Sequence, residues 1–212
     1  MMHRQSPNLN GLAIFAVILL VAVAAQASAQ DTPELKGDHA TIEDAVAMVE
    51  SMGGMAIWRD LAAVHFVHEW DIVNRPDRYL ENEILDLIGP RSHVTMESEI
   101  NSRMRAYSPE HRYWSINNGE FEYGSEELLE RAMERAPYSL YRLARAVARG
   151  DSDIVVRFGT IDGISNLPAL EFIGSDGAAH GWILLNTRKE PTIWSTTQYI
   201  YVLGPLAEHI EG

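Results

Sequence analysis

The chain contains no cysteine among its 212 residues. This absence excludes disulfides, thiol nucleophiles, cysteine-ligated zinc and iron–sulfur clusters, so the fold must be stabilised by its core alone. The sequence also lacks a Gly-x-Ser-x-Gly elbow, a glycine-rich phosphate loop and a dinucleotide-binding fingerprint. An enzymatic activity would therefore depend on positioned acid–base side chains, and we expect no cofactor.

Basic residues are scarce relative to acidic ones. The chain has 17 lysines and arginines against 30 aspartates and glutamates, which gives a formal net charge of −13 at pH 7. Such a surface repels the phosphates of nucleic acids and the head groups of anionic lipids. We therefore expect neither nucleic acid nor a membrane among the partners of the mature protein.

Long apolar segments are absent except near the N-terminus. The apolar stretch Leu12–Ala25 follows Arg4 and precedes the small residues Ala27-Ser28-Ala29, which is the pattern of a cleaved secretory signal. The stretch has 14 residues, whereas a membrane-spanning helix needs about 20, so a permanent anchor is the weaker alternative. No cysteine follows the apolar stretch, which excludes a lipoprotein anchor, and no twin arginine precedes it. We therefore expect export by the general secretion route. We predict a signal peptide at 1–29, cleavage after Ala29 and a periplasmic or secreted protein.

The first half of the mature chain has helical patterns. Residues 30–40 are polar and predict a flexible lead-in to one domain at 41–212. Thr41 with Asp44 resembles a capping box, and Gly53-Gly54 interrupts the helix that it opens. Gly89-Pro90 divides the later helical stretches. The predicted helices cover 41–52, 55–73, 77–88 and 92–106.

The second half has mostly strand patterns. A hairpin is predicted at 111–123 around Asn117-Asn118-Gly119, followed by a helix that Ser125 caps and Pro137 ends. Turns at Arg149–Ser152 and Ser175–Gly177 separate further strands. These strands are predicted at 138–148, 153–161, 166–173, 178–186 and 192–203. Helices followed by hairpin-linked strands indicate an α+β fold.

This order of elements resembles the NTF2-like superfamily, particularly its SnoaL-like enzymes. Three segments carry the resemblance: Phe121–Leu129 as a strand leading into a helix, the hairpin Arg149–Ser152, and the final strand Ile193–Tyr199. The resemblance implies a curved antiparallel sheet that N-terminal helices close into a cone with an interior pocket. It also implies a possible homodimer. The helical stretch at 77–106 is longer than is usual in the superfamily, and its frequent Asp-Asp after the second helix is missing.

Two histidines are the first catalytic candidates. On the predicted helix at 55–73, His65 and His68 share the apolar face that must turn inward. An imidazole titrates near neutral pH, which suits general acid–base catalysis. Core histidines bonded to the backbone or to tyrosines are the alternative. Asp71 follows His68 by three positions and could orient its ring, although it could also be a solvated or capping residue.

A metal site is a further alternative. His65 could share a cation with His68 or Glu69, and a third ligand would come from His93, His111 or His180. The order His-x-x-His-Glu matches neither His-Glu-x-x-His nor His-x-x-Glu-His. We therefore expect no metal.

Several polar and aromatic side chains are candidates for binding the substrate. Tyrosines on strands face inward in part, and a charge within an apolar strand either faces water or serves a site. The predicted substrate-binding residues are Tyr113, Tyr123, Tyr138, Arg142, Asn166, Trp194 and Gln198.

The resemblance implies a cofactor-independent lyase that acts by acid–base catalysis on a small aromatic substrate. The exported acidic chain is similar to the sphingomonad diarylpropane lyases of lignin catabolism, which release formaldehyde from a diol and leave a stilbene. Two alternatives stay open. One is a dehydratase or isomerase acting on another hydrophobic substrate, and the other is a non-catalytic periplasmic ligand-binding protein.

Overall fold

The computed structural model describes residues 35–70, 78–151, 153–161, 165–197 and 200–203. The chain divides into the units Met1–Thr32 and Pro33–Gly212, and every described residue belongs to the second unit. The predicted signal peptide at 1–29 lies outside the described residues. Among the described residues, no helix is both long enough and apolar enough to cross a membrane.

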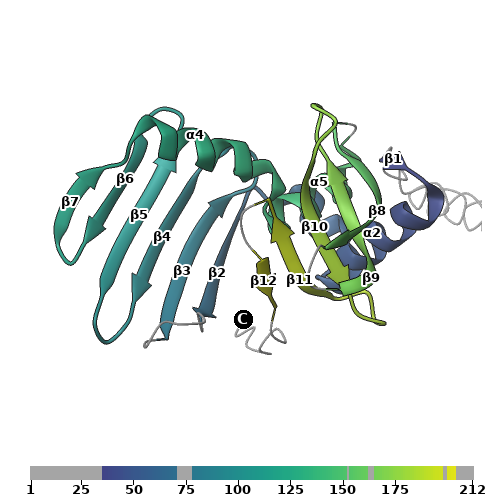
Figure 1. Ribbon diagram of the computed structural model, residues 1–212, viewed down its shortest axis with the longest axis horizontal. Coiled ribbons are helices and arrows are strands. Elements are labelled where there is room, and N and C mark those ends of the chain that lie inside the picture. The colour runs from purple at the N-terminus through teal and green to yellow at the C-terminus, as the bar shows by residue number, and fades with distance from the viewer. Residues whose placement is uncertain (1–34, 71–77, 152, 162–164, 198–199, 204–212) are drawn as a thin grey trace, which may run out of the picture. The chain divides into compact units, whose positions relative to one another are not determined.

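One sheet is an antiparallel meander in which the strands follow their chain order, β2-β3-β4-β5-β6-β7 (Figure 1). Neighbouring strands pair without a shift of register from β2 to β7. Residues directly opposite each other therefore share a face along the whole sheet. The strands are β2 Ala63–Trp70, β3 Tyr79–Asp86, β4 Ser92–Glu97, β5 Ser102–Ser108, β6 Arg112–Asn117 and β7 Glu120–Tyr123.

The second sheet has the strand order β1-β8-β9-β10-β11-β12. The short strand β1 pairs parallel to β8, and the other neighbours are antiparallel. Its strands are β1 Lys36–Gly37, β8 Val155–Ile161, β9 Ser165–Ile173, β10 Ala179–Leu185, β11 Pro191–Thr196 and β12 Ile200–Val202. β1 and the start of the helix that begins at His39 both fall within the predicted lead-in at 30–40.

The helices are α2 His39–Ser51, α3 Met55–Asp60, α4 Glu126–Arg135, the 3₁₀ turn η1 Ala136–Tyr138 and α5 Leu140–Arg149. The main hydrophobic core lies between α2, α3 and α5 and the second sheet. Met48 and Leu143 pack with Phe172 and Ile183 in one cluster, and all four side chains are fully buried. Leu85 of β3 belongs to the same cluster. The core therefore holds α2 and α5 against one end of the β2–β7 sheet.

The α+β class and several local predictions are confirmed. The hairpin at 117–119 joins β6 to β7, and Asn118 and Gly119 have the positive φ angles, 48° and 88°, that a tight hairpin turn requires. Ser125 caps α4, because its side chain accepts a hydrogen bond from the Leu128 N–H at 3.2 Å. The turn at 175–177 joins β9 to β10.

The predicted helix at 55–73 is wrong beyond Asp60. Residues 63–70 form β2, and every one of them pairs with β3, from Ala63 opposite Asp86 to Trp70 opposite Tyr79. Val64, His65 and His68 fit helical spacing, but Val64, Phe66, His68 and Trp70 fit a period of two equally well. The pairing with β3 decides between the two patterns.

Four more predictions of element type are wrong. The predicted helices at 77–88 and 92–106 are strands β3, β4 and β5, although Gly89-Pro90 does separate two of them. The predicted strand at 138–148 is mostly α5, whose buried Leu140, Leu143, Ala144 and Val147 have helical spacing. The predicted hairpin at Arg149–Ser152 is the end of α5, where Gly150 is left-handed with φ 68°. In the predicted strand at 192–203, β11 ends at Thr196 and β12 begins at Ile200.

The residue that caps the N-terminus of α2 also differs from the prediction. Asp38, and not Thr41, caps α2, since its side chain accepts from the Thr41 N–H at 3.0 Å. Thr41 is fully buried, and its hydroxyl lies 3.2 Å from the Val156 carbonyl in β8. This contact ties α2 to the second sheet.

Candidate functional site

One face of the β2–β7 sheet holds the buried carboxylate Glu81 together with His68. Strand alternation and the unshifted register place every second residue of β2 to β6 on the face of His68. We call it the His68 face. It comprises Val64, Phe66, His68, Trp70, Tyr79, Glu81, Glu83, Leu85, Ser92, Val94, Met96, Arg103, Arg105, Tyr107, Tyr113, Ser115 and Asn117. Glu81, Leu85, Ser92, Val94, Met96 and Ser115 are buried.

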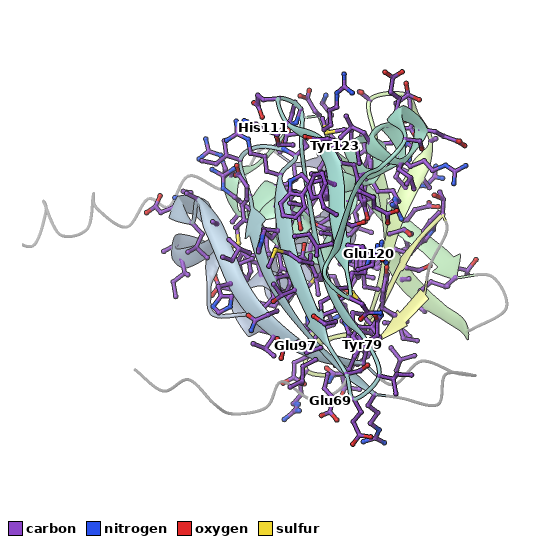
Figure 2. The ribbon with its side chains drawn as sticks, turned by 90° about the vertical axis from the view of Figure 1, so that its left-hand side faces the viewer. Glu69, Tyr79, Glu97, His111, Glu120 and Tyr123 are labelled. Carbon is purple, nitrogen blue, oxygen red and sulfur yellow. The ribbon has the colours of Figure 1, made fainter. Side chains whose placement is uncertain are left out.

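The opposite face, which we call the His65 face, is more exposed and has a different chemistry. Val67, Leu80 and Ile84 are each more than half exposed there, as are Phe121 and Tyr123 on β7. Trp114 stacks on Phe121 with ring centroids 6.1 Å apart. Figure 2 shows that Glu69, Tyr79 and Glu97 lie at one end of this sheet and that His111 and Tyr123 lie at the other.

His68 lies among aromatic side chains. Its Nε2 is 3.3 Å from the hydroxyl of Tyr141 on α5, and its ring centroid is 4.4 Å from Phe66 and 5.3 Å from Trp70. Burial lowers the pKa of His68 below its ordinary value of 6.5. Burial also raises the pKa of Tyr141 to about 12. At neutral pH, His68 is therefore an uncharged base next to a protonated phenol.

Glu81 lies directly opposite His68 on β3. Its side chain is almost completely buried, and its carboxylate is 3.6 Å from the guanidinium of Arg105. Burial raises the pKa of Glu81, and the charge of Arg105 only partly opposes this effect. The two facing groups are thus shifted in opposite directions, and each is shifted toward its uncharged form. Such pairs are characteristic of acid–base sites.

Other polar groups surround this pair. Glu83 accepts a hydrogen bond from the Ser92 hydroxyl at 2.5 Å. Tyr113 lies beside Arg105. A row of rings continues from β2 to the second sheet, with Trp70 5.4 Å from Tyr201 and Tyr201 stacked on Trp194 at 4.4 Å.

Unpartnered buried polar atoms gather on this face. Among the described residues, four buried side-chain nitrogen or oxygen atoms have no hydrogen-bond partner: His68 Nδ1, Trp70 Nε1, Arg103 Nε and Ser139 Oγ. The first three all belong to the His68 face. Buried polar groups are normally paired, so a concentration of unpaired ones on one face is the feature expected of a site that takes a ligand.

The structure separates the two predicted catalytic histidines, which corrects the prediction that they share a face. His65 and His68 are three residues apart on a strand, so their side chains point to opposite faces. The His65 ring is exposed and bonds Asn82 Oδ1. Asp71 and Gln198 lie outside the described residues, and the Asn166 side chain, on β9, lies outside them too.

The predicted substrate-binding residues are dispersed. Tyr113 lies on the His68 face, whereas Tyr123 lies on the His65 face and is 66% exposed. Trp194 joins the ring row through Tyr201, and its indole N–H donates to the Tyr138 carbonyl at 3.1 Å. The Tyr138 ring stacks on His180 with centroids 4.4 Å apart.

Arg142 was predicted on a strand of the sheet, but it is a buried residue of α5. Its guanidinium donates to four backbone carbonyls, those of Asp86, Ala136, Gly89 and Arg91, at 2.8 to 3.0 Å. These bonds hold the β3–β4 turn against the helix. Arg142 therefore has a structural role, and its predicted contact with a substrate has no support.

The histidines of the metal alternative do not converge. His65 and His68 point to opposite faces, so they cannot share an ion. His93 lies 6.2 Å from Trp114, whereas His111 contacts Ser108 and His180 contacts Asp176. The part of the chain that the structure describes holds no group of three potential metal-ligating side chains.

Sequence reasoning missed Glu81, Glu83, Arg103 and Arg105. The signal was present as Glu-x-Glu at 81–83 and Arg-x-Arg at 103–105, because a period of two aligns both pairs on one face of a sheet. The prediction of helices over 77–106 concealed it.

No family model, curated protein or solved structure matches this chain.

Proposed function

We propose that this protein is an acid–base enzyme that acts on a small hydroxylated aromatic molecule at the His68 face. One observation carries the proposal: His68 and Glu81 are opposite each other on β2 and β3, and burial shifts the pKa of each toward the uncharged form. Uncharged His68 can accept a proton, and the raised pKa of Glu81 makes its carboxyl a better proton donor than an exposed glutamate at the same pH.

The reaction that we propose is a lyase reaction that requires no cofactor. For a diarylpropane diol, His68 would remove the proton of the departing CH₂OH hydroxyl. The C–C bond to that carbon would break and release formaldehyde, and its electron pair would form the new C=C bond. Glu81 would protonate the benzylic hydroxyl, which leaves as water. The Tyr141 hydroxyl, 3.3 Å from His68 Nε2, would orient the base.

The aromatic surroundings support an aromatic substrate. The ring centroids of Phe66 and Trp70 lie 4.4 and 5.3 Å from that of His68. The ring of Tyr201 lies 5.4 Å from that of Trp70. Aromatic rings recognise flat apolar bodies through stacking and edge contacts. The acid–base assignment depends on the site, whereas the diarylpropane substrate comes from the resemblance to the NTF2-like superfamily. One of the segments that suggested this resemblance, the predicted hairpin at Arg149–Ser152, is a helix end.

The test is turnover by the purified protein against a panel of diaryl diols, followed by stilbene absorbance and released formaldehyde. We expect turnover to survive chelator treatment, to fall at least about 100-fold in His68→Gln or Glu81→Gln, and to be unchanged in His65→Gln. Equal losses in His65→Gln and His68→Gln would contradict the assignment of the site. No turnover by wild type would reject the lyase proposal.

A ligand-binding protein without catalytic activity is the second candidate. The unpaired buried atoms of His68 and Arg103 favour a bound ligand whether or not it reacts. Saturable binding of a panel member without product formation, lost in His68→Gln, would support this candidate over the enzyme.

A further inference from the structure

Arg103 differs from the other half-buried charges of the His68 face. Arg105 has Glu81 at 3.6 Å, and Glu83 has the Ser92 hydroxyl. Arg103 acts on Glu81 only through its charge, which lowers the pKa of that carboxylate, and its Nε is buried without a hydrogen-bond partner among the described residues. Leaving a guanidinium partly desolvated and unpaired is costly. An anionic group from outside the chain would remove this cost.

The chemistry of the unpaired atoms specifies the ligand group. Arg103 Nε can only donate hydrogen bonds, so its partner must be an acceptor. The Trp70 N–H already acts on the carboxylate of Glu81 and lowers its pKa, so Trp70 needs no partner from outside the chain. The guanidinium is a planar donor that binds a carboxylate through two parallel bonds. A carboxylate is therefore the best match for Arg103.

The register indicates the size of the ligand. His68, Glu81, Met96 and Arg103 are successive partners across β2 to β5. Adjacent strands are about 4.8 Å apart, so roughly 14 Å separates the backbones of β2 and β5. The side chains of His68 and Arg103 shorten this span at its two ends. The thioether of Met96 lies between them, and methionine sulfur packs well on aromatic rings.

We propose that the ligand is a carboxylic acid with a flat apolar body, whose carboxylate binds Arg103 while the body covers Met96 and its other end reaches His68 and Glu81. This inference rests on the proposed use of the His68 face and adds the class of its ligand. The carboxylate could belong to an aromatic acid or to a fatty acid, and the test separates these two sources.

The test is calorimetric titration of the wild-type protein with four probes. The probes are 6-hydroxy-2-naphthoate, its amide, laurate and laurate's amide. We expect the naphthoate to bind about 10- to 100-fold more tightly than its amide, which is the effect of a charged hydrogen bond. A preference for laurate over naphthoate would reject the flat body and assign the site to fatty acids. No binding of either acid up to about 1 mM would overturn the proposal.

Two variants test whether Arg103 causes the preference for the acid over its amide. Arg103→Met keeps the apolar stem of the side chain and should bring acid and amide to equal affinity. Arg131→Met is the matched control, because Arg131 is exposed on α4 and pairs with Glu127; it should leave the preference intact. A preference that persists in folded Arg103→Met would refute the role of Arg103. If the protein prefers the acid to its amide but shows no turnover, this inference stands and the enzyme proposal fails. The failure of one proposal can therefore be distinguished from the failure of the other.

Discussion

The four bonds of Arg142 lead to a quantitative prediction about stability. In Arg142→Met, the carbonyls of Asp86, Gly89, Arg91 and Ala136 lose a charged donor at 2.8 to 3.0 Å. A hydrogen bond to a charged group contributes about 1.5–3 kcal/mol. The Ala136 bond is buried and the other three are partly buried, so water restores part of the loss. We expect the free energy of unfolding to fall by about 3–5 kcal/mol.

Urea denaturation followed by circular dichroism measures this change. With a denaturant slope of about 2 kcal/mol per molar, the midpoint should fall by about 2 M. Arg145→Met is the matched control on the same helix. Arg145 donates through Nε to a single carbonyl, that of Leu61 at 2.8 Å, and its loss should cost about 1 kcal/mol. Equal shifts in the two variants would refute the structural role of Arg142, as would a loss of ligand binding by folded Arg142→Met.

Three further predictions concern other parts of the fold. Gly150→Ala places a side chain at φ 68° at the end of α5 and should destabilise the protein by about 1 kcal/mol in urea; an unchanged midpoint would contradict the left-handed cap. Phe172→Ala removes a fully buried ring and should cost about 3–5 kcal/mol in the same assay, whereas a loss under 1 kcal/mol would contradict this core. The pKa of His68 is lowered from 6.5 in the folded state, so the unfolded chain takes up the proton first, and the free energy of unfolding should fall below pH 6.5 more steeply in wild type than in His68→Gln. Parallel pH profiles would show that His68 is not buried as described.

Local signals predicted part of the fold correctly because the sequence neighbours that make them also make the structure. Asn118-Gly119 can adopt the positive φ angles of a hairpin turn, and Ser125 can cap a helix, without help from distant residues. The α+β class followed from these signals. Elements that depend on pairing with remote strands were predicted less well.

The segment around His68 illustrates the difficulty. Val64, His65 and His68 have the spacing of a helix face, and Phe66, His68 and Trp70 have the spacing of a strand face. Only the ladder to β3 decides, and that ladder joins residues up to 23 positions apart, from Ala63 to Asp86. His68 was predicted as a site residue, but its partners Glu81 and Tyr141 could not be found without that pairing. The charged pairs at 81–83 and 103–105 are informative only once both segments are known to be strands.

The central claim is that ligands bind on the His68 face and not on the His65 face. The most direct measurement is the NMR spectrum of ¹³C-labelled imidazole rings during titration with 6-hydroxy-2-naphthoate. The two histidines lie on one strand, three residues apart, so each is a control for the other. The account predicts that the His68 ring signals shift in a saturable way and that the His65 signals stay in place. Saturable shifts at His65, with His68 unchanged, would contradict it.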